Sequence, residues 1–361
     1  MLEDRLPMNT SSLRRTPVAS GKPRASRDPK VVTLEMVAEA AQVSAATVSR
    51  ILNGSAVVSD AKKQAVDDAI ARLGFAPNPV ARGLAGGRTL SIGVVTQSID
   101  SPFYGAALRG VEEELEKASH IPLFVSGQWN AREEARCIDV LRSRRVDGLI
   151  VLTGRLSDTL LRSCAKSLPV VVTGRNLKAP GLFAINFDNF ECGRLATSHL
   201  LQLGQRRIAF ISGDSGHPDA EDRHRGYRTA LAEAGVAYDP ELVVPGLYHE
   251  ASGLQAVEQL IQSRRKFTAI FSANDQMAAG AALGLHRRSL RVPDDISLVG
   301  FDDLPASEFS LPPLSTVRQP ALELGRLAAS AVLQMLRGVK PTVRVPEPVL
   351  VARESTRPLR G

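Results

Sequence analysis

The spacing of hydrophobic positions changes once along the chain and divides it into two regions. From Val31 to Phe75, apolar residues recur every three to four positions, which is typical of amphipathic helices. From Leu90 onward, short continuous apolar runs alternate with helical stretches of about 12–17 residues. Continuous apolar strands joined by helical crossovers predict parallel sheets with both faces covered by helices.

The apolar runs of the second region are predicted as strands. They are residues 90–96, 121–126, 146–154, 168–174, 183–188, 206–213, 241–246, 267–275 and 295–303. This number exceeds one sheet of ordinary size. We therefore expect two doubly wound subdomains side by side, with a ligand between them at the carboxyl ends of the strands.

The first region is predicted to hold three helices. Thr33 is a candidate N-cap of the first helix, Ser44 of the second, and Ser59 or Asp60 of the third. The connection between the first two helices, at Gln42, is tight. Two helices joined by a short turn, the second with small outward side chains, are typical of a helix-turn-helix.

The outer face of the second helix is small and mildly basic, with Ala45, Ala46, Thr47, Ser49 and Arg50. A helix that enters a major groove roughly 12 Å wide must not be bulky where the backbones approach. Its hydroxyls can donate to phosphates or base edges, and Arg50 can reach a guanine or a phosphate. The alternative is a small helical subdomain packed on the core, but a packed subdomain needs no tether such as the Pro- and Gly-rich segment that follows.

Composition narrows the class of protein. The 361 residues carry a formal net charge of +7 with a pI of about 9.6, which suits a polyanionic partner without requiring one. We expect residues 1–30 to be a disordered basic arm, or else a solvated tail without a task. Cys137, Cys164 and Cys192 fall in predicted helices and favour buried thiols in a reducing compartment. Without a signal peptide or a bilayer-length apolar run, the expected location is the cytoplasm, with no membrane partner.

Enzymatic and metal sites are not predicted. The GDSG tetrapeptide at 213–216 resembles the nucleophile segment of trypsin-like proteases, but it follows a parallel-type strand and is interpreted as a loop. Phosphate-cradling, dinucleotide-binding and zinc-protease motifs are absent, and the six histidines have no ligand-like spacing. We therefore expect no enzyme, no cofactor and no metal. A transport binding protein is a further alternative, but it has no use for residues 31–89.

Residues 32–89, VTLEMVAEAAQVSAATVSRILNGSAVVSDAKKQAVDDAIARLGFAPNPVARGLAGGRT, closely resemble the DNA-binding and hinge region of the lactose/galactose repressor (LacI/GalR) family of bacterial transcription regulators. The resemblance continues through segments such as SPFYGAALRGVEEEL, FSANDQMAAGAALGL and RVPDDISLVGFDDLP. It implies an all-α helix-turn-helix headpiece followed by an α/β core that is similar to periplasmic binding proteins, with two doubly wound parallel-sheet subdomains. It also implies a regulator, expected to be a repressor, whose operator affinity a small molecule switches.

The resemblance implies a division of the chain into four parts, the last of which consists of two subdomains. The expected parts are a basic arm (1–30), a DNA-binding domain (31–76), a hinge helix and linker (77–89) and a core (90–357), the core being divided into an N-subdomain (90–188 with 320–340) and a C-subdomain (189–318 with 341–357).

The resemblance places base readers at Ala45 and Ala46, directly after the serine cap. The other positions that match DNA contacts of the family are Thr33, Ser44, Thr47, Ser49, Arg50, Asn53, Asn78, Ala81 and Leu84. Leu84 matches the residue that pries open a base step in the minor groove, with packing on the core as its alternative role. Because two hinges must meet at one groove, a two-fold homodimer on a pseudo-palindromic operator is expected.

The effector is expected to be a carbohydrate that binds between the subdomains. Ser101 caps a helix that points into the cleft, so Ser101, Phe103 and Tyr104 are candidate contacts. The resemblance adds Arg223, Asn274, Asp302 and, as a stacking ring, Tyr248. Arg, Asn and Asp side chains together suit vicinal hydroxyls. Three alternatives stay open: Asp275 caps a helix instead of touching ligand, Phe103 belongs to the core, and Trp129 stacks on a sugar.

Overall fold

The structure is a computed structural model that describes residues 32–52, 58–75, 88–214 and 216–359. The chain divides into two compact units between Ala81 and Arg82. This boundary falls in segment 77–89, where the sequence places a linker. The expected arm at residues 1–30 and four candidate DNA contacts lie outside the described residues; these contacts are Asn53, Asn78, Ala81 and Leu84.

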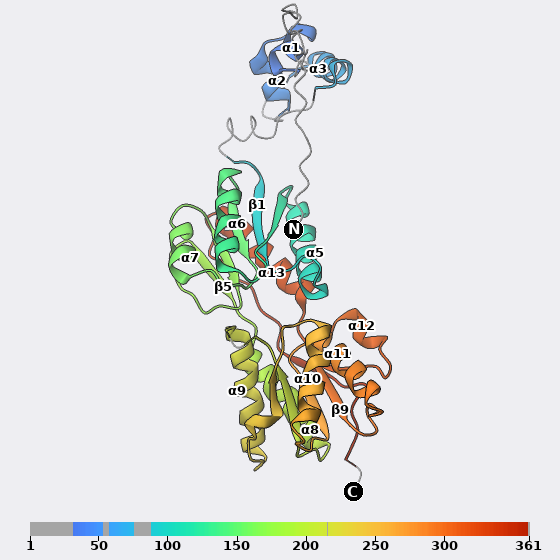
Figure 1. The fold of residues 1–361 in the computed structure, drawn as a ribbon. Helices are drawn as coiled ribbons and strands as arrows, with labels where there is room; N and C mark the ends of the chain where they lie inside the picture. Colours follow the sequence, from blue (N-terminus) through green and yellow to red (C-terminus); the bar gives the residue numbers. More distant parts are fainter. Residues whose placement is uncertain (1–31, 53–57, 76–87, 215, 360–361) are drawn as a thin grey trace, which may run out of the picture. The chain divides into compact units, whose positions relative to one another are not determined.

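Within its described residues, the first unit consists of three helices, which we call the headpiece (Figure 1). The helices are α1 (Leu34–Ala40), α2 (Ala45–Leu52) and α3 (Asp60–Leu73). Each contributes a fully buried valine to a small shared core: Val37, Val48 and Val66. This core fixes α2 against α1 and α3, as a helix-turn-helix requires.

Side-chain caps fix the starts of the first two helices. Thr33 Oγ1 accepts a hydrogen bond from the Met36 N–H at 3.4 Å, and Ser44 Oγ accepts one from the Thr47 N–H at 3.2 Å. Each bond satisfies an N–H group that the helix leaves unpaired, as the sequence predicts. Ser59 stands at the N-cap position of α3, but its side chain makes no capping hydrogen bond.

The second unit, the core, contains two sheet lobes (Figure 1). The N-lobe sheet has the order β2-β1-β3-β4-β5 and is parallel throughout. Helices α5 and α13 cover one face, and α6 and α7 cover the other. The elements are β1 (Ser91–Thr96), α5 (Pro102–Lys117), β2 (Ile121–Ser126), α6 (Ala131–Ser143), β3 (Gly148–Val151), α7 (Asp158–Ala165), β4 (Val170–Thr173), β5 (Leu182–Ile185) and α13 (Ala321–Leu336).

The C-lobe sheet has the order β11-β10-β9-β8-β6-β7. Its pairings are parallel except that β11 runs antiparallel to β10. Helices α8 and α9 pack together, as do α10 and α11. The elements are α8 (Asn189–Gln202), β6 (Ile208–Ser212), α9 (Pro218–Glu233), a 3-10 turn (Pro240–Leu242), β7 (Val243–Pro245), α10 (Glu250–Gln262), β8 (Ala269–Ser272), α11 (Asp275–Arg287), β9 (Ser297–Asp302), α12 (Pro305–Glu308), β10 (Ser315–Arg318) and β11 (Val349–Val351).

The predicted fold class, a helical headpiece with an α/β core of two subdomains, is confirmed. Every apolar run predicted as a strand contains one. The pattern missed β10 and β11, which are only four and three residues long. The missed edge strand β11 is antiparallel to its neighbour β10. In the described part of the chain, the helices are too short or too polar to span a membrane.

The chain passes between the lobes three times: after β5, after β10 and after α13. The second crossing returns α13 to the N-lobe, where it packs along α5. Two glycines allow this close approach. A Cβ at Gly110 would lie 2.0 Å from the Leu322 carbonyl oxygen, and one at Gly325 would lie 2.0 Å from the Ala107 carbonyl oxygen. Because three connecting segments join the lobes, the relative motion we expect is a hinge rotation.

The cysteines carry no disulfide. Cys164 and Cys192 are buried and Cys137 is half-buried, all as free thiols. Burial raises the pKa of each thiol above its ordinary value, so all three are protonated at neutral pH. They are packing residues of helices α6, α7 and α8, as the sequence predicts.

Asp275 does not cap α11. The cap is Asn274, whose Oδ1 accepts a hydrogen bond from a first-turn N–H at 2.9 Å. Asp275 is the first helical residue and is buried. Its carboxylate accepts hydrogen bonds from Ser307 Oγ at 2.7 Å, Thr316 Oγ1 at 2.7 Å and the Leu304 N–H at 2.8 Å. It therefore joins α11 to α12 and β10.

We predict that Asp275→Ala lowers the free energy of unfolding of the core by about 2–4 kcal/mol, because three buried donors lose their acceptor. Urea titration followed by circular dichroism measures this change. The control is Asp222→Ala, since the Asp222 side chain is 42% exposed and pairs only with Arg225. Its effect is expected to stay within about 0.5 kcal/mol. Equal effects of the two substitutions would contradict the structural role of Asp275.

Candidate functional site

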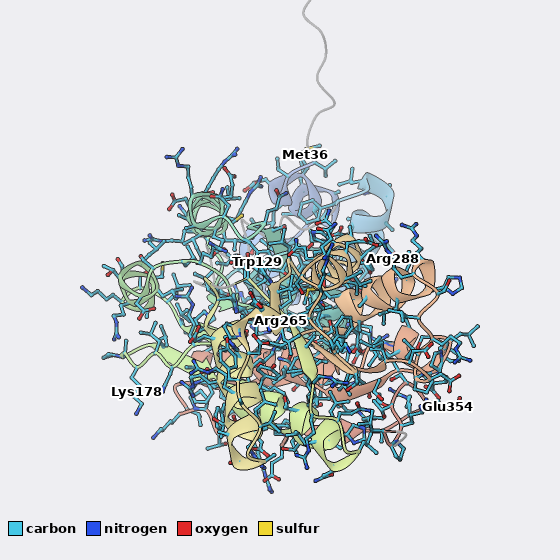
Figure 2. The ribbon with its side chains drawn as sticks, turned by 60° about the horizontal axis from the view of Figure 1, so that its bottom comes forward. Met36, Trp129, Lys178, Arg265, Arg288 and Glu354 are labelled. Atoms are coloured by element: carbon cyan, nitrogen blue, oxygen red, sulfur yellow. The ribbon has the colours of Figure 1, made fainter. Side chains whose placement is uncertain are left out.

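A cavity of about 400 Å³ lies between the two lobes, among the loops that follow the carboxyl ends of the strands. Its walls include every residue that the sequence nominated for effector binding: Ser101, Phe103, Tyr104, Arg223, Tyr248, Asn274 and Asp302. Trp129, labelled in Figure 2, lines it as well. Sequence reasoning missed the other described lining residues: Ser98, Asp100, Thr153, His217, Asp219, Leu247, His249, Glu250, Gln276 and Gln319.

Arg223 is the buried cation of the cavity. Only 6% of the surface of Arg223 is exposed. Nε donates to Asn189 Oδ1 and Nη1 donates to the Ala273 carbonyl, each at 2.8 Å. The guanidinium carbon lies 3.8 Å from the centroid of the Phe301 ring. Two hydrogen bonds and a ring face thus hold the guanidinium in one orientation.

Two carboxyl groups accompany Arg223. Asp302 is buried at the end of β9, and Asp219 precedes Arg223 by one turn of α9 with a side chain that is 15% exposed. Burial raises the pKa of Asp302 well above its ordinary value and that of Asp219 to about 6, while Arg223 opposes both shifts. Among the described residues, neither carboxylate receives a hydrogen bond. Both therefore offer acceptors to a ligand.

The backbone of Asp302 is strained, with φ at 113°. This conformation is rare for a residue with a Cβ and costs on the order of 1–3 kcal/mol. Asp302 lines the cavity at this position. Such strain persists at positions where the side chain has a task other than stability.

Aromatic rings from both lobes meet in the cavity. Trp129 follows β2 of the N-lobe, and its ring stands edge-to-face on His217, with centroids 4.7 Å apart. It lies nearly parallel to the Tyr248 ring, at 6.4 Å and 16°. Tyr104 lies 6.2 Å from Trp129, and Phe103 lies 5.3 Å from Tyr104. These rings supply the apolar half of the cavity wall.

His217 presents a hydrogen-bond donor to the cavity. It caps α9, and its Nδ1 accepts the Asp219 N–H at 3.3 Å. Burial lowers the pKa of His217 to about 4, so the ring is neutral at pH 7, and the capping bond assigns its proton to Nε2. Among the described residues, this buried Nε2 has no partner, and neither does Tyr248 Oη. Two buried polar atoms of residues that line the cavity are therefore without a hydrogen-bond partner among the described residues.

Asn274 acts through its neighbours. Its Oδ1 caps α11, and its Nδ2 donates to the Tyr248 carbonyl at 3.0 Å. The sequence nominated it as a direct effector contact, but in this structure its amide orients the backbone that carries Tyr248. Ser101 caps α5 through its backbone position, and its side chain makes no capping hydrogen bond.

The missed residues carried recognisable signals. His217 precedes Pro218 at a helix start, just as Ser101 precedes Pro102. Asp219 stands four residues before Arg223, so both share one face of α9. The first pattern would have found His217, and the second would have found Asp219.

An ion pair links the lobes beside the cavity. Arg155 follows β3 of the N-lobe and donates to Asp214, which follows β6 of the C-lobe. Together with the Trp129–His217 contact, it holds the two lobes against each other. A ligand that changes the angle between the lobes must alter these contacts.

In the headpiece, the candidate DNA contacts lie along α2. Ala46 and Arg50 are exposed, and Thr47 and Ser49 are half-buried. Ala45 is half-buried and packs partly against the headpiece core, so Ala46 is the more exposed member of the pair.

Hydrogen bonds position the polar candidates of the headpiece. Ser44 Oγ and Thr47 Oγ1 share a bond of 2.8 Å, and Arg50 Nε donates to the Ala46 carbonyl at 3.2 Å. Thr33 is exposed at the start of α1. The hydroxyls thus cluster at the N-terminus of α2, where the helix presents positive charge.

Comparisons with known proteins give the family. The chain matches the profile "Bacterial regulatory proteins, lacI family" over residues 33–78 and "Periplasmic binding protein-like domain" over residues 197–356. It is 37% identical to the HTH-type transcriptional regulator GalR of Escherichia coli strain K12, over 90% of this chain and 96% of GalR. The chain belongs to the lacI family of bacterial regulatory proteins.

Solved structures agree with this lacI-family assignment. The lac repressor dimer bound to operator and the anti-inducer ONPF is similar with a TM-score of 0.82 and 30% identity, over 91% of this chain and all of that one. A complex of the transcriptional regulator CelR with cellobiose matches with a TM-score of 0.68 and 34% identity, over 90% and 99% of the chains. These relatives are transcription regulators, and the lacI-family chain described here is a DNA-binding transcription regulator.

We predict that Asp219 makes the stability of the ligand-free protein depend on pH. Its pKa rises from 3.8 to about 6 on folding, so ionisation above pH 6 opposes folding. The stability contributed by the protonated group is complete below pH 4 and is lost as the pH rises through 6. Asp219→Asn removes this loss. Urea unfolding from pH 4 to 7.5 measures this effect. The free energy of unfolding of the variant, relative to that of the parent, is expected to increase with pH. A difference that does not change with pH would contradict the assignment.

Proposed function

We propose that the chain is a homodimeric repressor that binds a pseudo-palindromic operator, and that a sugar or sugar derivative in the cavity changes its affinity for that operator. The observation that carries this proposal is the cavity itself, where a fixed guanidinium, two unbonded carboxyl groups and a cluster of aromatic rings converge.

The cavity chemistry favours a hydroxyl-rich ligand. Carboxylates such as Asp302 accept hydrogen bonds from hydroxyls, while Arg223 and the His217 Nε2–H donate to ring and hydroxyl oxygens. The ring of Trp129 offers an apolar surface to the C–H face of a sugar. The volume of about 400 Å³ lies in the range of small-molecule sites. The related CelR was solved with cellobiose, which supports the same class of ligand.

The headpiece supports operator binding. Helix α2 exposes the small Ala46 and the cationic Arg50, a combination that can enter a major groove. The related lac repressor was solved as a dimer on its operator, which supports the same assembly here. The further DNA contacts implied by the family resemblance, Asn53, Asn78, Ala81 and Leu84, remain part of this proposal.

The lobes provide the coupling. A ligand in the cavity touches residues of both lobes, so it favours one angle between them. The N-lobe begins with β1 at Ser91, directly after the segment that leads from the headpiece. A change in lobe angle therefore moves the attachment point of each headpiece in a dimer and changes how well the two headpieces match two half-sites.

We predict that two arginine substitutions separate the two activities. Arg50→Ala should weaken binding to DNA selected from a random-sequence pool by about tenfold or more. It should leave the thermal shift with galactose, glucose, ribose or cellobiose unchanged. Arg223→Ala should abolish the sugar response and keep DNA affinity, because the guanidinium is confined to the core cavity.

Fluorescence anisotropy of the full chain, over a range of salt concentrations, measures DNA binding in this test. The DNA affinity of the parent should fall steeply with salt. The control is Arg206→Ala. Arg206 is exposed on the surface of the second unit, so its substitution should change neither DNA binding nor the sugar response. Circular dichroism checks that each variant folds. The proposal fails if Arg223→Ala keeps the sugar response or if no sugar changes DNA affinity.

A further inference from the structure

The charge of the cavity is unbalanced. Among the described residues that line it, the carboxyl groups outnumber the guanidinium groups: Asp100, Asp219, Glu250 and Asp302 against Arg223. His217 adds no charge, because burial lowers its pKa to about 4. Burial favours the protonated form of Asp302, but Asp100, Asp219 and Glu250 still outnumber Arg223, so the cavity carries an excess of negative charge at neutral pH.

Helix N-termini at the cavity would by themselves favour an anion. Four helices have their N-cap residues in its wall: Ser101 for α5, His217 for α9, His249 for α10 and Asn274 for α11. The positive end of a helix attracts negative charge. The first turns of the last three helices, however, already carry Asp219, Glu250 and Asp275. These side chains already place negative charge at the positive helix ends, so a negatively charged ligand gains little from them.

Arg223 is poorly placed to bind a phosphate or carboxylate. Two parallel N–H groups of one guanidinium edge usually hold such a group. Here Nε already donates to Asn189 and Nη1 to the Ala273 carbonyl, so two of the three guanidinium nitrogens are engaged within the protein. Arg155, the nearby arginine of the N-lobe, is paired with Asp214.

We propose that the cavity selects an uncharged, hydroxyl-rich ligand and rejects the phosphorylated and acidic forms of the same sugar. The inference rests on the proposed function, since it specifies the chemical class of the effector. Asp219 and Asp302 accept hydrogen bonds from hydroxyls of the ligand, and His217 and Tyr248, whose Nε2–H and Oη have no partner among the described residues, line the same cavity. A ligand anion would lie beside the Asp219 carboxylate between two walls of protein, where like charges repel more strongly than in bulk water.

The test compares matched pairs of sugars by isothermal titration calorimetry on the full chain at pH 7.5. The pairs are glucose with glucose 6-phosphate, galactose with galacturonate, and ribose with ribose 5-phosphate. For each sugar that binds, the anionic form is expected to bind at least about tenfold more weakly. The members of a pair share most hydroxyls, so the difference reports mainly on charge.

Two variants of α9 separate charge selection from shape. Asp219→Asn keeps the size of the side chain and removes one negative charge, so the ratio of anionic to neutral Kd should shrink by about threefold or more. Asp222→Asn removes a charge from the same helix outside the cavity wall, and its ratio should match that of the parent. A purely structural role of Asp219 would weaken both members of a pair equally and leave the ratio unchanged, which would contradict the proposal.

The outcomes separate this inference from the proposed function. An anionic sugar that binds as tightly as its neutral partner, or more tightly, would overturn charge selection and leave a sugar-responsive regulator in place. A panel in which neither form of any sugar binds would overturn the carbohydrate effector and the inference together. The structure predicts that neutral sugars bind and their anionic forms bind more weakly. It also predicts that Asp219→Asn reduces this difference and that Asp222→Asn does not.

Discussion

The burial of the Arg223 guanidinium is the constraint on which the rest of the site depends. A cation removed from water is tolerated only where hydrogen bonds and countercharge replace its hydration. Here the replacements come from separate elements: Asn189 at the start of α8, the Ala273 carbonyl after β8 and the Phe301 ring in β9. These elements must pack correctly before the cation can be accommodated. The C-lobe wall of the cavity is therefore formed before any ligand arrives.

The N-lobe contributes the other wall, and the topology explains why the two walls face each other. Parallel strands bring their carboxyl ends to one edge of each sheet, and the loops at these edges carry the side chains that meet between the lobes. Three chain crossings join the lobes, and α13 is held tightly against α5 by glycines at their contact. A ligand bound between the lobes contacts both of them, so the expected response is a change in the angle between the lobes.

Much of this architecture could be predicted from the sequence, because hydrophobic periodicity reports burial directly. The strands found by their apolar runs are long enough to carry a pattern, whereas β10 and β11 are too short. The cap of α11 was assigned to Asp275 instead of Asn274, since the residue that caps a helix is decided by backbone angles at its first turn. The family resemblance indicated Arg223 and Asp302, but the capping role of His217 and the burial of Asp219 depend on three-dimensional packing.

The central claim is that the cavity and the DNA-binding helix are linked through the angle between the lobes. Thermodynamic linkage makes this claim measurable from the ligand side, because coupling between two sites is reciprocal. The most direct measurement is the Kd of a cavity-binding sugar for the full chain, by calorimetry, with and without saturating operator DNA. The account predicts that operator changes this Kd by the same factor by which the sugar changes operator affinity. A sugar Kd that is identical with and without operator would contradict it.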